Sequence, residues 1–237
     1  MPIHKLKLLS RREIAPGTIE FIFDKPAGLS FIPGQYAGFT LINPGETDAG
    51  GITRRFSLLS APDDNHIAFA TRIQNSAYKR VLNALAIGDE IKFAGPTGNF
   101  TLHEETSIPA VFIAGGIGIT PFYSMIQHAT QHQSQQSLIL FYGNQSIHET
   151  AYLDEINSMQ SQNPNFILIP TMANPHESWK GETGFITHTM IKKYISDIYS
   201  PIYYVCGSPT MVTVLQETLA EMGIDEDKIK VEDFPGY

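Results

Sequence analysis

The chain has 237 residues, of which 42% are hydrophobic, enough to bury the cores of one large or two medium-sized domains. Its formal net charge of −8 is unevenly spread, with +2 over residues 1–100 and −10 over residues 101–237, which argues against nucleic acid as a partner. The single cysteine excludes an internal disulfide or a cysteine-ligated metal cluster, and no apolar run reaches the roughly 20 residues of a membrane span.

The first hundred residues contain short strand-like segments separated by turn signals. Strands are predicted at residues 3–9, 18–23, 36–42, 55–59, 66–71 and 90–94. Pro-Gly, Asn-Pro-Gly, Pro-Asp-Asp and Gly-Asp turns separate them. Short strands at this spacing are typical of a β-barrel.

One helix interrupts these strands over residues 76–85, where Ala77 and Leu82 belong to an apolar face. Ser76 is a suitable N-cap for it. The free N–H groups of the first turn, together with Lys79 and Arg80, form a candidate phosphate cradle. Helix capping alone is the alternative explanation for Ser76.

Beyond residue 105 the pattern changes to strands that alternate with helices. Strands are predicted near 110–114, 138–142, 166–170, 202–206 and 228–231, and helices near 121–132, 150–160, 187–195 and 209–222. This alternation indicates a parallel sheet wrapped by helices. We therefore predict a barrel domain over residues 1–103 and an α/β domain over residues 108–237.

The strand at 110–114 runs into Gly115-Gly116-Ile117-Gly118-Ile119-Thr120-Pro121, a glycine turn that opens a helix. Glycines let backbone N–H groups approach a phosphate, and the helix N-terminus adds the positive end of its dipole. Pro121 suits the first helical turn, although it stands where a Gly-x-Gly-x-x-Gly motif has its third glycine. We predict a nucleotide phosphate site here, and a glycine-rich turn without a ligand is the alternative.

Cys206 follows an apolar strand and precedes Gly207 at a strand-to-helix turn. Ligands gather at such carboxyl ends of strands in a doubly wound sheet. A buried cysteine that serves only as a small apolar side chain is the alternative.

His128 and His132 have the i, i+4 spacing that metal ligands can have on a helix. No glutamate follows His128, and no third ligand is evident in the sequence. We therefore interpret the pair as a solvated helix end and predict no metal site.

Several motifs, in this order along the chain, resemble those of the ferredoxin–NADP⁺ reductase-like flavoprotein family. Arg54-Arg55-Phe56-Ser57 resembles the family's Arg-x-Tyr-Ser flavin motif, with Phe in place of Tyr. The others are Pro33-Gly34-Gln35-Tyr36, Gly95-Pro96-Thr97-Gly98-Asn99-Phe100, the loop from Gly115 to Pro121, Cys206-Gly207-Ser208-Pro209-Thr210-Met211 and Glu232-Asp233-Phe234. Where the family has Gly-x-x-Ser-x-x-Leu, this chain has Ser76, Lys79 and Leu82. The resemblance implies a β-barrel flavin-binding domain followed by a doubly wound parallel-sheet nucleotide-binding domain.

The resemblance also implies an FAD site and a site for NADH or NADPH. The residues implied for FAD are Arg54, Arg55, Phe56, Ser57, Thr71, Ser76, Ala77, Tyr78, Lys79 and Phe234. Those implied for the nucleotide are Gly116, Gly118, Thr120, Pro121, Cys206, Gly207 and Met211. The implied catalytic residues are Ser57 near flavin N5, Cys206 in the nicotinamide pocket and Glu232, which would polarise that region. Tyr237 competes with Phe234 for the exposed face of the flavin ring.

The residues of the flavin motif suit a flavin chemically. Arg54, Phe56 and Ser57 offer a cation, an aromatic platform and a small hydrogen-bonding group within four residues. On a regular strand, however, Arg54 and Phe56 share one face while Arg55 and Ser57 share the other. The resemblance, not the spacing, therefore places them at one flavin, and an exposed strand edge with two solvated arginines is the alternative.

The implied function is an oxidoreductase that transfers a hydride from NADH or NADPH to FAD and passes electrons to a separate acceptor, such as ferredoxin or an oxygenase component. NADH is favoured because residues 101–237 contain no arginine for a 2′-phosphate. A stand-alone flavin or ferric reductase and a non-catalytic flavin-binding electron-transfer subunit are the alternatives. Since no apolar signal region follows the N-terminus, we expect a cytoplasmic protein.

Overall fold

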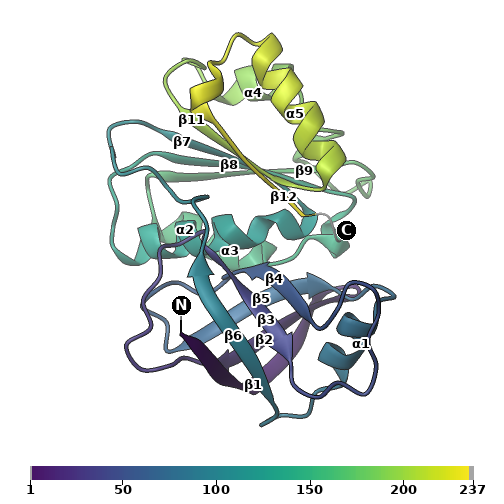
Figure 1. Ribbon diagram of the computed structural model, residues 1–237. Coiled ribbons are helices and arrows are strands. Elements are labelled where there is room, and N and C mark those ends of the chain that lie inside the picture. Colours follow the sequence, from purple (N-terminus) through teal and green to yellow (C-terminus); the bar gives the residue numbers. More distant parts are fainter. Residues whose placement is uncertain (1, 235–237) are drawn as a thin grey trace.

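The computed structural model describes residues 2–234, and its first sheet has six antiparallel strands in the order β4-β3-β6-β1-β2-β5 (Figure 1). These strands are β1 (Ile3–Ala15), β2 (Thr18–Asp24), β3 (Tyr36–Leu41), β4 (Thr53–Ser57), β5 (His66–Arg72) and β6 (Glu90–Thr97). Phe56 on β4 and Phe69 on β5 stack with parallel rings 4.2 Å apart. This contact joins the two edge strands, so the sheet curls into the predicted barrel.

Two strands differ most from the sequence prediction. β1 is longer than expected because it changes partner, pairing with β6 near Leu6 and with β2 from Leu8 onward. β4 begins and ends earlier than expected, and Leu58 and Leu59, buried like strand residues, leave the sheet after Ser57. Their apolar character reflects burial in the core, not membership of the strand.

The helix of the barrel, α1 (Ala77–Ala84), packs its apolar face against the barrel. Ser76 caps it, with its hydroxyl accepting a hydrogen bond from Lys79 N. Tyr78, in the first turn of this helix, is buried, and its hydroxyl donates a hydrogen bond to Phe39 O at 3.0 Å. The helix N-terminus is thereby fixed beside β3 and β4.

The second sheet has six parallel strands in the order β10-β9-β8-β7-β11-β12. They are β7 (Ala110–Gly115), β8 (Leu138–Asn144), β9 (Phe166–Met172), β10 (Glu182–Thr183), β11 (Ile202–Gly207) and β12 (Ile229–Asp233). Only β10, with two residues, was too short to be predicted. Three 3₁₀ turns accompany the strands: η1 (Gly116–Gly118), η2 (Ile147–Glu149) and η3 (Glu226–Lys228).

Helices cover both faces of this sheet, as the alternating pattern predicted. Helices α2 (Ile119–Gln131) and α3 (Leu153–Gln162) lie between the sheet and the barrel, whereas α4 (His188–Tyr194) and α5 (Pro209–Glu221) lie on the far face (Figure 1). Phe112 and Tyr204 face the first pair, and Val111 and Tyr203 face the second. Apolar side chains on both faces explain why these strands are continuous hydrophobic runs in the sequence.

The barrel and the α/β unit contact each other through polar and aromatic side chains. Ser124 on α2 donates to Ser60 O at 2.7 Å, and Phe100 packs against Phe122 and Tyr204. The predicted domain boundary, after residue 103 and before residue 108, lies between β6 and β7 and stays a prediction. Among residues 2–234, no helix is both long and apolar enough to cross a bilayer.

Candidate functional site

A pocket of ≈ 370 Å³ lies between the barrel and the parallel sheet. One wall comes from β3, β4, β5 and α1, and the other from η1, the first turn of α2 and the end of β12. The pocket adjoins the carboxyl ends of β7 and β11, where the strand order changes direction. Open α/β sheets bind their ligands at such switch points.

The structure brings half of the predicted site residues together in this pocket. Those that line it are Arg54, Arg55, Phe56, Ser57, Thr71, Lys79, Thr120, Glu232 and Phe234. The predicted residues that do not line it are Ser76, Ala77, Tyr78, Gly116, Gly118, Pro121, Cys206, Gly207 and Met211. Lining residues that the sequence prediction missed are Tyr36, Ala70, Arg72, Ile117 and Asp233. Tyr36, Ile117 and Asp233 lie within motifs that the sequence analysis had singled out, and Ala70 and Arg72 flank the predicted residue Thr71.

The four residues of the flavin motif all reach the pocket because β4 is an edge strand. Arg54 lies over the ring of Tyr78 at 5.1 Å, on the same side of the strand as Phe56. Arg55 lies over the ring of Tyr36 at 5.8 Å. Successive side chains of β4 therefore do point to opposite sides of the strand. All four nevertheless line one pocket, since both sides of an edge strand can border it.

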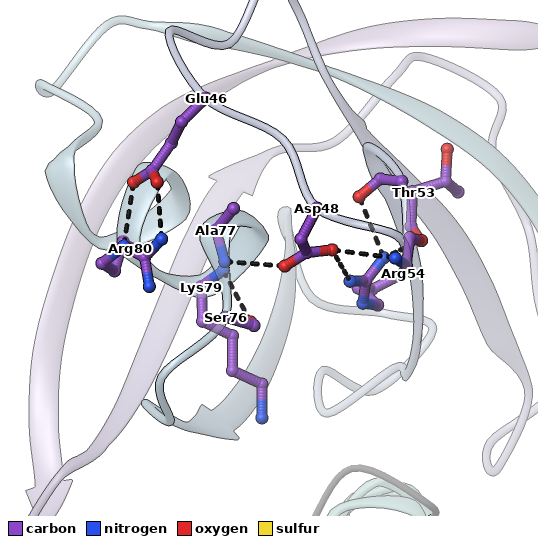
Figure 2. A network of polar contacts seen from close by, with 10 residues as sticks. Glu46, Asp48, Thr53, Arg54, Ser76, Ala77, Lys79 and Arg80 are labelled. Carbon is purple, nitrogen blue, oxygen red and sulfur yellow. Dashed lines mark hydrogen bonds and ion pairs between the residues drawn. The ribbon is translucent and has the colours of Figure 1, made fainter.

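Asp48 places a carboxylate at the N-terminus of α1, as Figure 2 shows. Its Oδ2 accepts a hydrogen bond from Ala77 N at 2.8 Å, and its Oδ1 lies 3.3 Å from Arg54 Nη2. The Ala77 bond, followed by the Gly50 bond, lowers the pKa of Asp48. An anion held between a guanidinium and a helix N-terminus is the arrangement that binds phosphate. The donor set therefore fits a phosphate group, with Asp48 occupying its place in this structure.

Further cations line the same wall. Lys79 is buried, with 8% of its surface exposed, and it borders the pocket with Arg72. Burial lowers the pKa of Lys79, and the charges of Arg54 and Arg72 lower it further. Cations that repel one another in this way favour a polyanionic ligand, which would relieve the repulsion.

Ser57 and Glu232 join the two walls of the pocket. The Ser57 hydroxyl donates to Glu232 Oε2 at 3.3 Å. Burial raises the pKa of Glu232 to about 7, the Ser57 bond opposes this shift, and Asp233 adds to it. A carboxyl group with this pKa holds or releases a proton near neutral pH, which is the property expected of a group that acts in a proton-coupled reaction.

Replacing Glu232 by glutamine is expected to raise stability at alkaline pH relative to the unaltered protein. The folded-state pKa of about 7 exceeds the ordinary value of 4.5, so ionising Glu232 disfavours the folded state. The free energy of unfolding of the unaltered protein should therefore fall, relative to Glu232→Gln, as pH rises from about 4.5 to about 7. The expected difference above that window is about 1–2 kcal/mol, since the side chain is only partly shielded.

Urea unfolding of both proteins at several pH values checks this expectation. Glu217→Gln is a matched control, because Glu217 is an exposed glutamate on α5. A difference that does not vary with pH would contradict the raised pKa of Glu232.

The glycine turn after β7 brings the backbone close to the end of β11. A Cβ at Gly118 would lie 2.7 Å from the carbonyl carbon of Cys206 and 2.9 Å from Gly207 Cα. Thr120 Oγ1 donates to Ile117 O at 3.2 Å and so stabilises the start of α2. The glycine is therefore needed for close contact within the protein.

Cys206 and Phe234 occupy different environments. Cys206 is fully buried, burial raises the pKa of its thiol, and the residue is not part of the pocket lining. Phe234 lines the pocket, and its N–H donates to Gly207 O at 3.0 Å. Tyr237, the competing candidate, lies outside the described residues.

Comparisons with known proteins agree with this geometry. A family described as "Oxidoreductase NAD-binding domain" matches residues 112–217. One relative is a subunit of the Na(+)-translocating NADH-quinone reductase of Haemophilus influenzae (strain 86-028NP), 31% identical over 159 residues, which cover 65% of this chain and 38% of the relative. The corresponding subunit of the Pasteurella multocida (strain Pm70) enzyme is 28% identical over 202 residues, covering 78% of this chain and 49% of the relative. The chain thus spans less than half the length of these curated relatives.

Solved structures share the whole fold. The Amycolatopsis cytochrome P450 reductase GcoB superposes with a TM-score of 0.84 and 22% identity, covering 100% of this chain and 72% of the other. A ferredoxin NADP⁺ reductase from Neisseria gonorrhoeae with bound FAD and NADP gives a TM-score of 0.83 at 20% identity, covering 99% of each chain. At this identity the likeness establishes the architecture, a barrel followed by a doubly wound sheet.

Proposed function

Because the chain belongs to the ferredoxin reductase-like family of oxidoreductases, we propose that it transfers electrons from NADH or NADPH through FAD to a separate acceptor. The observation that carries the proposal is the anion cradle formed by Arg54 and the N-terminus of α1, now filled by the carboxylate of Asp48. Arg54 of this cradle lines the pocket together with the aromatic residues Phe56 and Tyr36. A phosphate site beside aromatic rings suits a flavin nucleotide.

FAD would supply a ring that accepts a hydride from the nicotinamide and releases electrons to the next carrier. The residues of this chain would bind, orient and shield it. Arg54 and the α1 N-terminus would hold the phosphates, and Lys79 and Arg72 would add positive charge. Ser57 and Glu232 would hold one proton between them at the seam of the two walls.

The nicotinamide nucleotide is proposed to bind at the η1 turn and the start of α2, next to Cys206 and Gly207 at the end of β11. The family match over residues 112–217 supports this placement. The helix N-terminus and the close backbone at Gly118 offer N–H groups to its phosphates. Thr120 and Ile117 border both this turn and the pocket, so the two cofactors would meet there.

The electron acceptor is proposed to be a separate protein. The curated relatives of this chain bear names that refer to quinone, and a structural neighbour is a cytochrome P450 reductase. A ferredoxin or an oxygenase component fits the same role. The cytoplasmic location expected from the sequence stays a prediction.

We expect the purified protein to be yellow and to hold about one FAD per chain, and we expect NADH to bleach it within milliseconds to seconds. NADH should give the higher kcat/KM, because residues 101–237 contain no arginine and carry a charge of −10, which disfavours the 2′-phosphate of NADPH. Chromatography of the heat-released chromophore and stopped-flow absorbance with each nucleotide are the measurements.

Each outcome has a separate meaning. A colourless protein that FAD cannot reconstitute would overturn the proposal, and a flavin that NADH does not bleach would favour a non-catalytic electron-transfer role. Turnover with free flavin or ferric iron as efficient as with any protein acceptor would favour a stand-alone reductase.

A further inference from the structure

Three side chains outside the pocket converge on one point at the seam between the barrel and α2. His128 and His132 lie one turn apart on α2, and Asp63 comes from the loop between β4 and β5. One nitrogen or oxygen atom of each lies within 4.8 Å of the others. The sequence showed the two histidines but could not show the aspartate, which lies 65 positions before His128.

The distances match those of atoms that share one metal ion. Asp63 Oδ2 lies 3.6 Å from His128 Nδ1 and 3.3 Å from His132 Nε2. Two ligand atoms at zinc bond lengths of about 2.0–2.1 Å are about 3.4 Å apart in tetrahedral geometry. Both distances from Asp63 Oδ2 are therefore close to that value, and the third pair of atoms lies within 4.8 Å.

The hydrogen bonds around the cluster prepare the rings as ligands. His132 Nδ1 lies 2.9 Å from His128 O, and because a carbonyl oxygen only accepts, Nδ1 carries the proton and Nε2 presents its lone pair. His128 Nδ1 is buried and makes no hydrogen bond within residues 2–234.

The loop that carries Asp63 is held against α2 by its neighbours. Both Asp64 carboxylate oxygens lie 3.2 Å from Gln127 Nε2, and Oδ2 also accepts from Ala61 N at 2.8 Å. Ser124 Oγ donates to Ser60 O. Asp63 itself is 61% exposed, so an ion can enter from solvent.

We propose that Asp63, His128 and His132 bind a divalent transition-metal ion that bridges the barrel and the nucleotide-binding unit. Two imidazoles and one carboxylate suit zinc, with nickel and copper as chemical competitors. The ion would tie the loop after β4 to α2 without touching the flavin pocket. It would thereby restrict movement of one unit relative to the other.

The test titrates zinc chloride into untagged, cofactor-loaded protein. Isothermal titration should show one zinc per chain, and zinc should raise the Tm. Asp63→Ala and His132→Ala, both at exposed positions, should each weaken zinc binding by roughly tenfold or more. His188→Ala, at an exposed histidine on α4, should leave it unchanged.

Absence of stoichiometric zinc binding to the unaltered protein would overturn the proposal. Undiminished affinity in His132→Ala would place the ion elsewhere and overturn it as well. If Asp63→Ala alone kept full affinity, the histidines would bind zinc within α2 and the bridge would be disproved. Hydrogen exchange should independently show zinc-dependent protection in both the Asp63 loop and α2.

Discussion

Arg54→Ala is expected to lower the affinity for flavin by roughly 10- to 100-fold, so that most of the purified variant is colourless. The guanidinium would make charge-assisted hydrogen bonds to phosphate, each contributing about 1.5–3 kcal/mol. In this structure it already holds a carboxylate, that of Asp48, at the N-terminus of α1. Flavin content per chain and the Kd for FAD of the stripped protein are the measurements.

Two further variants sharpen this test. Lys92→Ala removes an exposed cation from β6 that does not line the pocket, and it should retain normal flavin content. Asp48→Asn removes the anion that occupies the cradle, so it should bind FAD more tightly than the unaltered protein. If Arg54→Ala keeps its flavin, the phosphate site lies elsewhere. If Asp48→Asn loses flavin, Asp48 organises the cradle instead of competing for it.

Gly118→Ala is expected to destabilise the protein by about 1–3 kcal/mol and to abolish tight nucleotide binding. The backbone of Gly118 has φ −61° and ψ −4°, which alanine adopts easily, so the effect would come from contact alone. The added methyl group would overlap Cys206 O and the adjoining backbone of β11. Because backbone atoms cannot move aside as a side chain can, η1 would have to shift away from the strand.

Two other glycines provide graded controls. A Cβ at Gly143 would lie 3.4 Å from Ile186 Cδ1, a contact that a small side-chain movement relieves. At Gly115 the obstacle is the flexible end of Met211. Thermal unfolding should therefore give the largest loss for Gly118→Ala, an intermediate one for Gly115→Ala and a small one for Gly143→Ala. Equal losses at all three positions would contradict the steric explanation.

The sequence predicted every strand and helix of three residues or more outside the 3₁₀ turns, because each carries a local signal. The period of its apolar residues gives the element type, and turn residues give its limits. The end of β4 was misplaced because Leu58 and Leu59 are buried and make single backbone hydrogen bonds, to Gln35 O and Ala68 O, beyond the end of the strand. A buried residue beyond the end of a strand and a buried residue within it are both apolar, so the sequence does not distinguish them.

Most residues that line the pocket lie in motifs that the sequence analysis had singled out, although Tyr36, Ile117 and Asp233 within those motifs were not predicted as site residues. Residues whose role depends on distant contacts carry no such local signal. Asp48 lies in a loop with no motif of its own, and its role appears only when the loop meets α1. Asp63 completes a cluster with histidines that belong to another unit. Such partners are fixed by the docking of elements, which no local pattern records.

The hydrogen bond between Ser57 and Glu232 spans 175 positions of the chain, and this separation has a consequence for folding. Contacts so distant in sequence form late, after the local structure of each unit. Glu232 should then titrate near 4.5 while the units are folded but not yet docked, and near 7 once they have joined. Its proton uptake during refolding at pH 6 would therefore time the assembly of the two halves, separately from the folding of either.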